Sequence, residues 1–122
     1  MFTFPEGFLW GAATSSHQVE GDNFFNDWWK WEQSGGGLDR SSAACRHFSL
    51  YKEDFALARS LGHNAHRFSI EWSRVEPEEG HFSQSALDHY SSVLDALAAN
   101  DLEPVVTLYH FTSPAWFSRK GG

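Results

Sequence analysis

Cysteine is almost absent from this sequence, which holds a single one, Cys45, among its 122 residues. An internal disulfide is therefore excluded, and this cysteine usage fits a reducing compartment. Long apolar runs are also missing, since no window approaches the roughly 20 apolar residues that a membrane-spanning helix needs. The first residues, MFTFPEGF, lack the basic segment of a signal peptide. These absences predict a cytoplasmic protein outside the membrane.

Basic residues are few, because 9 Lys and Arg stand against 16 Asp and Glu and give a net charge of -7. This balance argues against nonspecific binding to nucleic acid or to an anionic membrane, and it leaves neutral ligands open. Neither GxGxxG nor a P-loop motif occurs, so nothing supports nucleotide binding. His63 and His66 have no neighbouring ligand set of the usual spacing. We expect neither a metal nor a cofactor.

What the sequence does contain is an alternation of strand and helix patterns. The expected elements are a strand from Phe8, a long loop over about 22–46 with one short helix, a helix over 47–61, a strand around 65–72, a helix over about 84–99 and a strand over 103–111. This alternation predicts a parallel sheet with right-handed crossovers, either doubly wound or part of a (β/α)8 barrel. Residues 1–122 are expected to form one domain.

Local signals predict where these elements end and which faces they bury. Gly62 is expected to end the first long helix, and Ser83 is expected to cap the second. Gly35, Gly36 and Gly37 predict a mobile connection inside the long loop. The side chains expected to face a core are Phe8, Leu9 and Trp10 at the start, the helix stripe Leu87, Tyr90, Leu94 and Leu97, and Val105, Val106 and Leu108, in a strand buried on both faces.

Polar side chains cluster where the predicted strands end. The three sets are His17, Gln18 and Glu20 after the first strand, Arg67 and Glu71 in and after the second, and His110 after the third. In a parallel barrel the carboxyl ends of the strands form the functional face, so these sets are candidates for one site. A glutamine amide donates and accepts hydrogen bonds, as sugar hydroxyls do. The pattern therefore favours a polyol ligand.

Each candidate also has a structural alternative. His110 is by default a hydrogen-bonded core histidine, and Arg67 needs an acceptor that is either an active-site or a structural carboxylate. The cluster of Trp28, Trp29 and Trp31 either stacks on sugar rings or pins the long loop to the core. Glu71 is a candidate acid, but glycoside hydrolysis needs two carboxyl groups about 5 to 9.5 Å apart, a separation that sequence spacing does not establish.

Three runs of the sequence resemble glycoside hydrolase family 1, the β-glucosidase and β-galactosidase family. They are FLWGAATSSHQVEG at 8–21, LYKEDFALARSLGHNAHRFSIEWSRVEP at 50–77 and EPVVTLYHFTSPAW at 103–116. The runs follow the family's order and span nearly the whole chain. The resemblance implies the first βαβαβ portion of a (β/α)8 TIM barrel. It also implies hydrolysis of β-linked glucosides or galactosides with retention, without a cofactor.

The resemblance implies roles for individual residues as well. Gln18 and His110 match residues that bind hydroxyls of the nonreducing sugar, and Arg67 matches the arginine beside the nucleophile. The positive charge of that arginine would keep the nucleophile ionised. Glu20 is expected to be a structural hydrogen-bonding partner. The side chains expected to stack on sugar are Trp28, Trp29, Phe111 and Trp116.

The sequence departs from the family chiefly in what is missing. The family's acid/base glutamate lies in an Asn-Glu-Pro motif and its nucleophile follows a later strand, and residues 1–122 contain no such motif. We therefore expect an N-terminal fragment with no catalytic residue, no activity alone, and self-association through an open sheet edge. Phe111 and Arg46 stand where the family often has tryptophan and aspartate. The alternative is a noncatalytic carbohydrate-binding or interaction module that uses the Trp28 to Trp31 cluster.

Overall fold

The computed structural model describes residues 2–35 and 39–121, and its elements follow the predicted order. They are β1 (Gly11–Ala13), α1 (Ser16–Val19), α2 (Asp27–Gln33), α3 (His47–Ser60), β2 (Ala65–Ser69), α4 (Trp72–Val75), α5 (Gln84–Ala99), β3 (Glu103–Thr107) and α6 (Ala115–Ser118). Both predicted long helices are confirmed as α3 and α5, and α2 is the short helix expected in the loop. Two residues of the predicted glycine connection, Gly36 and Gly37, lie outside the described residues. Within the described ranges, no helix has the length and apolar character needed to cross a membrane.

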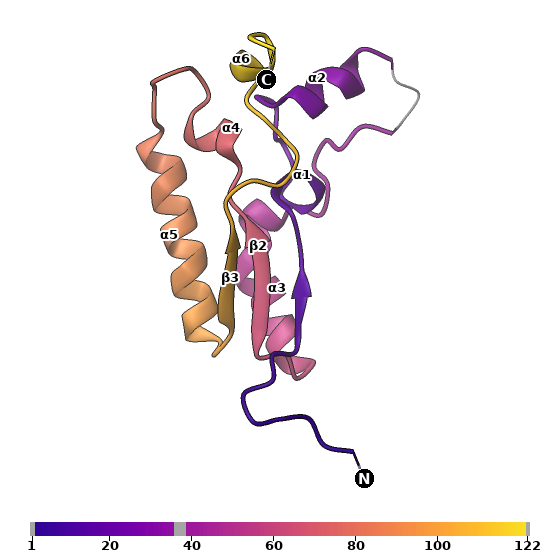
Figure 1. Ribbon diagram of the computed structural model, residues 1–122, viewed down its shortest axis with the longest axis vertical. Coiled ribbons are helices and arrows are strands. Elements are labelled where there is room, and N and C mark those ends of the chain that lie inside the picture. Colours follow the sequence, from indigo (N-terminus) through magenta and orange to yellow (C-terminus); the bar gives the residue numbers. More distant parts are fainter. Residues whose placement is uncertain (1, 36–38, 122) are drawn as a thin grey trace.

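The three strands form one parallel sheet in the order β1-β2-β3 (Figure 1). The register places Ala13 beside Arg67 and Arg67 beside Val105, so these side chains share one face of the sheet. In Figure 1, α3 lies behind the sheet and α5 lies beside β3. The predicted βαβαβ order is confirmed, and all three strands run toward the end that carries α1, α4 and α6.

The hydrophobic core fills the space between the sheet and the two long helices. Its most buried members are Phe55, Phe68, Tyr90, Val93, Leu97 and Leu102. The predicted stripe of α5 is half right, because Tyr90 and Leu97 are buried whereas Leu87 and Leu94 are 41% and 39% exposed. Val93, at helical spacing between Tyr90 and Leu97, takes a core position in their place.

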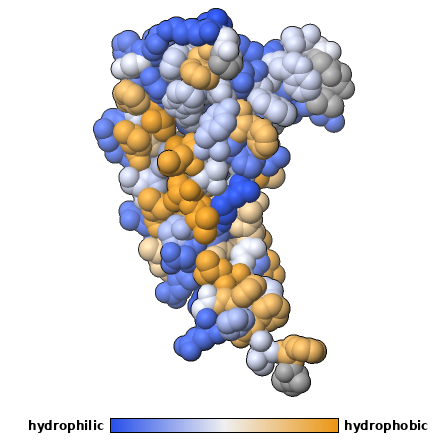
Figure 2. All heavy atoms as spheres, in the orientation of Figure 1, coloured by the Kyte–Doolittle hydropathy of each residue, from blue (hydrophilic) through white to orange (hydrophobic). Residues whose placement is uncertain are grey.

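Two groups of apolar side chains that were expected to be buried are exposed. They are Phe8, Leu9 and Trp10 before β1, and Val105, Val106 and Leu108 in and after β3. The prediction of burial is wrong because β1 and β3 are the two edges of a three-stranded sheet. Figure 2 shows apolar residues gathered over the sheet on the face turned to the viewer. Self-association through the open edge stays a prediction.

Gly21 lies in the turn after α1, where no side chain fits. Its φ of +82° is in the left-handed region, and a Cβ there would come 2.1 Å from the carbonyl oxygen of Ala43. We expect Gly21→Ala to lower the free energy of unfolding by about 3 kcal/mol in urea, since a positive φ alone costs about 1–2 kcal/mol. Gly80 has a φ of +76° with open space around it, so Gly80→Ala is the control and should lose only about 1 kcal/mol. Equal losses in the two variants would contradict the steric argument.

Candidate functional site

The carboxyl ends of the strands carry the candidate site, beginning with α1. The sequence predicted a strand tip here, and the structure instead forms one helical turn in which Gln18 is exposed. The turn closes because the Ser15 carbonyl oxygen accepts from the amides of Gln18 and Val19, each at 3.2 Å. The Ser15 hydroxyl donates to Gln18 Oε1 at 2.7 Å. This bond orients the side-chain amide and leaves its NH2 group to donate to a ligand.

Gln18 shares an open pocket of about 230 Å³ with His110. The other residues that line it are Ser15, His17, Trp28, Phe111 and Thr112. His110 lies half-buried in the loop after β3, with the Phe111 ring edge-on at 5.1 Å. The φ of Phe111 is 65°, a strained value for a bulky residue of the kind that clusters at functional sites. The pocket thus brings together four predicted site residues, Gln18, Trp28, His110 and Phe111.

The other three predicted site residues, Arg67, Trp29 and Trp116, do not line this pocket. Arg67 is half-buried in β2, and its Nη1 donates to a main-chain carbonyl of the segment after β1 at 2.7 Å. Trp29 packs on the ring of Phe24 at 4.8 Å. Trp116 donates through Nε1 to the carbonyl oxygen of Glu76 at 2.9 Å. Trp29 thus packs within the long loop, and Trp116 ties α6 to the end of α4. Neither tryptophan needs a ligand to account for its position.

His17 lines the pocket, but both of its ring nitrogens are engaged by other side chains. Nε2 lies 2.9 Å from Glu32 Oε1, and Nδ1 lies 2.9 Å from Asn26 Nδ2. His17 and Asn26 are buried, and the Glu32 side chain is 8% exposed. His17 therefore ties α1 to α2 instead of presenting a nitrogen to a ligand.

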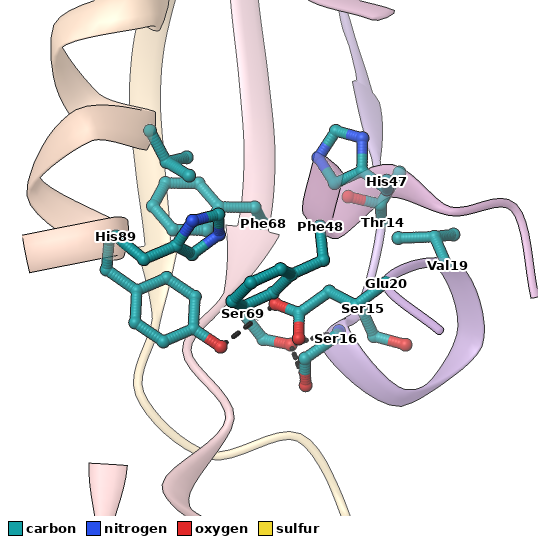
Figure 3. A pocket seen from close by; sticks show the side chains of 12 residues that line it. Thr14, Ser15, Ser16, Val19, Glu20, His47, Phe48, Phe68, Ser69 and His89 are labelled. Atoms are coloured by element: carbon teal, nitrogen blue, oxygen red, sulfur yellow. Dashed lines mark hydrogen bonds between the residues drawn. The ribbon is translucent and has the colours of Figure 1, made fainter. Parts of the chain in front are cut away.

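At the end of α1, Glu20 is buried in a polar network. Its Oε2 accepts from Arg74 Nε at 2.8 Å, and its Oε1 accepts from the Tyr90 hydroxyl at 2.9 Å. Figure 3 shows the Glu20 carboxyl beside Phe48 and His89 at a small cavity. Burial raises the pKa of the Glu20 carboxyl to about 7, although Arg74 and the Tyr90 hydroxyl oppose this rise. The expected structural role of Glu20 is confirmed by these partners.

The stability of the fold is expected to depend on pH through buried groups that act in opposite directions. The pKa of Glu20 is raised to about 7, so the stability that Glu20 contributes is present below its unfolded pKa of 4.5 and is lost as pH rises through about 7. Burial lowers the pKa of both His66 and His89 to about 4, so their contribution is present above 6.5 and is lost as pH falls through about 4. Because two histidines oppose one carboxyl, we expect the urea midpoint to rise from pH 4.5 to 6.5, and Glu20→Gln to steepen that rise. A flatter rise in this variant would refute the assignment.

Glu71, a candidate acid from the sequence, follows β2 and is fully buried. Its carboxyl group accepts hydrogen bonds from the hydroxyls of Ser16, Ser73 and Thr112 at 2.7 to 2.9 Å. A general acid or a nucleophile must reach its substrate, and this carboxyl group is enclosed by its own partners. Among the described residues, no carboxylate lines the pocket of Gln18 and His110.

Comparison with known protein families decides which family this architecture represents. Residues 1–122 match the glycosyl hydrolase family 1 profile over their full length. The chain belongs to that family. It is 37% identical to 1,4-beta-D-glucan glucohydrolase from Thermotoga neapolitana and 39% identical to beta-glucosidase A from Thermotoga maritima. These alignments cover 100% and 98% of this chain but only 31% and 29% of the two relatives.

Solved structures of family 1 enzymes superpose closely on the chain. A beta-glycosidase from Pyrococcus horikoshii is 55% identical with a TM-score of 0.92, and the match covers 98% of this chain and 28% of that one. The family 1 beta-glucosidase from Thermotoga maritima is 39% identical with a TM-score of 0.93, over 98% and 29% of the two chains. The family 1 chain is thus an N-terminal portion of a TIM barrel, as predicted, and the doubly wound alternative is excluded.

Two pairs of residues in this family 1 chain were missed by sequence reasoning. Ser15 and Thr112 line the pocket, and their positions next to the predicted strand ends were the available signal. Asn26 and Glu32 hold His17 from the long loop, where no periodic pattern pointed to them. Arg46, which the sequence singled out, precedes α3 as its N-cap residue in the left-handed conformation, and nothing in the structure explains its charge.

Proposed function

We propose that this chain supplies the sugar-binding part of the active site of a retaining β-glycosidase of the β-glucosidase type. The observation that carries the proposal is the pocket in which Gln18 and His110 meet at the carboxyl ends of parallel strands. An exposed amide and an imidazole offer hydrogen bonds to hydroxyls, while Trp28 and Phe111 offer apolar faces to a sugar ring. The names of the relatives support a β-linked glucoside as the substrate.

The chemistry of retention needs two carboxyl groups about 5 to 5.5 Å apart. Because no carboxylate lines the pocket among the described residues, both catalytic groups are expected to come from outside residues 1–122. Arg67 shares a sheet face with Ala13 and Val105, from which its charge would keep a neighbouring nucleophile ionised. We infer that the chain alone hydrolyses nothing. We also infer a cytoplasmic location, which the name of a human relative, cytosolic beta-glucosidase, supports.

A graft tests this proposal. Residues 1–122 replace the aligned segment of beta-glucosidase A from Thermotoga maritima, to which the chain is 39% identical. We expect the graft to hydrolyse an aryl β-glucoside and the isolated chain to show no hydrolysis. A folded graft without hydrolysis would overturn the proposal. So would hydrolysis by the isolated chain that Glu71→Gln abolishes.

A noncatalytic carbohydrate-binding module is the second candidate, favoured by the exposure of Trp28 and Trp31 at 44% and 46%. Their ring planes are inclined by 67° with centroids 5.9 Å apart, so the two rings do not form a flat platform. The isolated chain is titrated with cellobiose while tryptophan fluorescence is recorded. A saturable response that Trp31→Ala removes supports the module, and its absence supports the enzyme portion.

A further inference from the structure

We propose that Glu71 is a positioning residue that holds the two sugar-binding segments at a fixed separation. The inference rests on the proposed function, since it concerns how Gln18 and His110 are placed. Gln18 lies in α1, directly after β1, and His110 lies after β3. No strand pair joins these segments directly, because β2 lies between β1 and β3. Glu71 follows β2 and lies between them.

One oxygen atom of Glu71 contacts both segments. Oε2 accepts from Ser16 Oγ at 2.8 Å and from Thr112 Oγ1 at 2.9 Å. Ser16 and Thr112 are only 3% and 5% exposed, so water does not compete for either bond. Two short bonds to one atom set the distance between α1 and the loop after β3.

The carboxyl group of Glu71 is itself held firmly. Its Oε1 accepts from the Ser73 hydroxyl at 2.7 Å and from the Ser73 amide at 3.4 Å, which caps α4. The Glu71 amide donates to the Tyr90 hydroxyl at 3.0 Å. The carboxyl group thus accepts four hydrogen bonds, from the hydroxyls of Ser16, Ser73 and Thr112 and from the Ser73 amide, which matches the acceptor capacity of a carboxylate. Glu71 is therefore anchored to α4 and α5, and it transmits their rigidity to the pocket.

Short links connect each clamped hydroxyl residue to its sugar-binding neighbour. Ser16 and Gln18 belong to the single turn of α1. The Thr112 amide donates to the His110 carbonyl oxygen at 2.8 Å, which closes a tight turn. Movement of Ser16 or Thr112 therefore displaces a residue that would touch the sugar.

A second and longer connection runs through α2. Asn26 lies within hydrogen-bonding distance of His17, and the Ser113 amide donates to Asp27 Oδ1 at 3.0 Å. Main-chain bonds also join this segment to the loop after β3, from the Asp27 amide to the Ser113 carbonyl oxygen at 3.0 Å and from the Ala115 amide to the Phe25 carbonyl oxygen at 2.9 Å. The route reaches α1 through the side chains of His17 and its partners, so it is longer than the Glu71 contact and constrains the separation of Gln18 and His110 less closely. Loss of the Glu71 carboxyl group should loosen the pocket without dismantling it.

The test uses the graft, with castanospermine as the binding probe because it is the ligand named with one Thermotoga maritima beta-glucosidase structure. Glu71→Ala is expected to weaken castanospermine binding about tenfold. It should also lower kcat/KM about tenfold, since a misplacement of about 1 Å can cost up to about 10²-fold in rate. In Glu71→Gln, the amide oxygen can still accept from Ser73, and the NH2 group can donate to the hydroxyls of Ser16 and Thr112. This variant should restore affinity to within about threefold of the unsubstituted graft.

Glu76→Ala is the matched control. Glu76 is another buried carboxylate, and it accepts from Trp72 Nε1 at 2.7 Å and from the Gly80 amide at 2.8 Å, away from both segments. This variant should lose stability and keep its affinity for castanospermine. Three results each overturn the inference: a change below about twofold in Glu71→Ala, an equal loss in Glu76→Ala, or no rescue by Glu71→Gln.

Hydrogen exchange on the 122-residue chain separates this inference from the proposed function. The amide of Glu20 donates to the Ser16 carbonyl oxygen, and the amide of Thr112 donates to the His110 carbonyl oxygen. Glu71→Ala is expected to speed hydrogen exchange about tenfold at both amides. Glu76→Ala should speed neither. If the unsubstituted graft is inactive, the proposed function fails while paired loosening still supports the clamp. Loosening of one segment alone, or of neither, overturns the clamp whatever the graft does.

Discussion

Glu20→Ala is expected to lower the free energy of unfolding by about 3–5 kcal/mol, because it leaves the charge of a largely buried partner unpaired. The Arg74 side chain is 16% exposed, and its Nε donates to Glu20 Oε2 at 2.8 Å. A guanidinium group does not lose its proton in a protein, so Arg74 stays charged after the carboxyl group is removed. Urea unfolding of the chain at pH 7 measures the loss.

The reverse substitution, Arg74→Met, should cost less than Glu20→Ala. Burial already raises the pKa of Glu20 to about 7, so this carboxyl group can take up a proton when its partner is gone. The ion pair between Lys120 and Glu79 is the surface control, since its side chains are 59% and 58% exposed. Glu79→Ala should change stability by less than about 1 kcal/mol. If Arg74→Met costs as much as Glu20→Ala, the charge argument fails.

Gln18→Ala in the graft is expected to lower kcat/KM for an aryl β-glucoside by about 10²–10³-fold, because hydrogen bonds to sugar hydroxyls strengthen in the transition state of glycoside hydrolysis. The Ser15 hydroxyl already orients the Gln18 amide, so the bond to substrate needs little rearrangement. Steady-state kinetics measure the loss.

The control for Gln18 is Trp29→Phe. Trp29 packs on Phe24 and does not line the pocket, so this variant should keep kcat/KM within about twofold of the graft. A loss in Gln18→Ala no larger than in Trp29→Phe would remove Gln18 from the sugar-binding site. A large loss in Trp29→Phe would instead place Trp29 in the sugar-binding site.

The positions of the long helices followed from local chemistry. The apolar spacing of α3 and α5 is a property of each segment alone, and Gly62 and Ser83 mark their ends. Ser83 Oγ accepts from the Ala86 amide at 3.3 Å, which confirms the predicted cap. The helices α1 and α4 were not predicted, because a single four-residue turn is too short to show a period.

Burial did not follow from local chemistry. Val105 and Val106 form the apolar strand that the sequence predicted, yet they are 44% and 39% exposed. A strand is buried only when other elements cover it, and β3 lies at an edge of the sheet. The same reason applies to Trp10, which packs on the rings of Phe4 and Phe8 instead of a core.

By itself, the sequence determined the family, the order of strands and helices, and the candidacy of Gln18 and His110. Only the tertiary structure decided that Gln18, Trp28, His110 and Phe111 share a pocket while Trp29 and Trp116 do not line it. It also decided the place of Glu71, whose bonds to Ser16 and Thr112 cross 55 and 41 residues of sequence. Hydrogen bonds depend on the distance and direction between two atoms, and at such separations these are set by how the strands pack. Local patterns carry residue types and periods, and the folded sheet supplies the geometry.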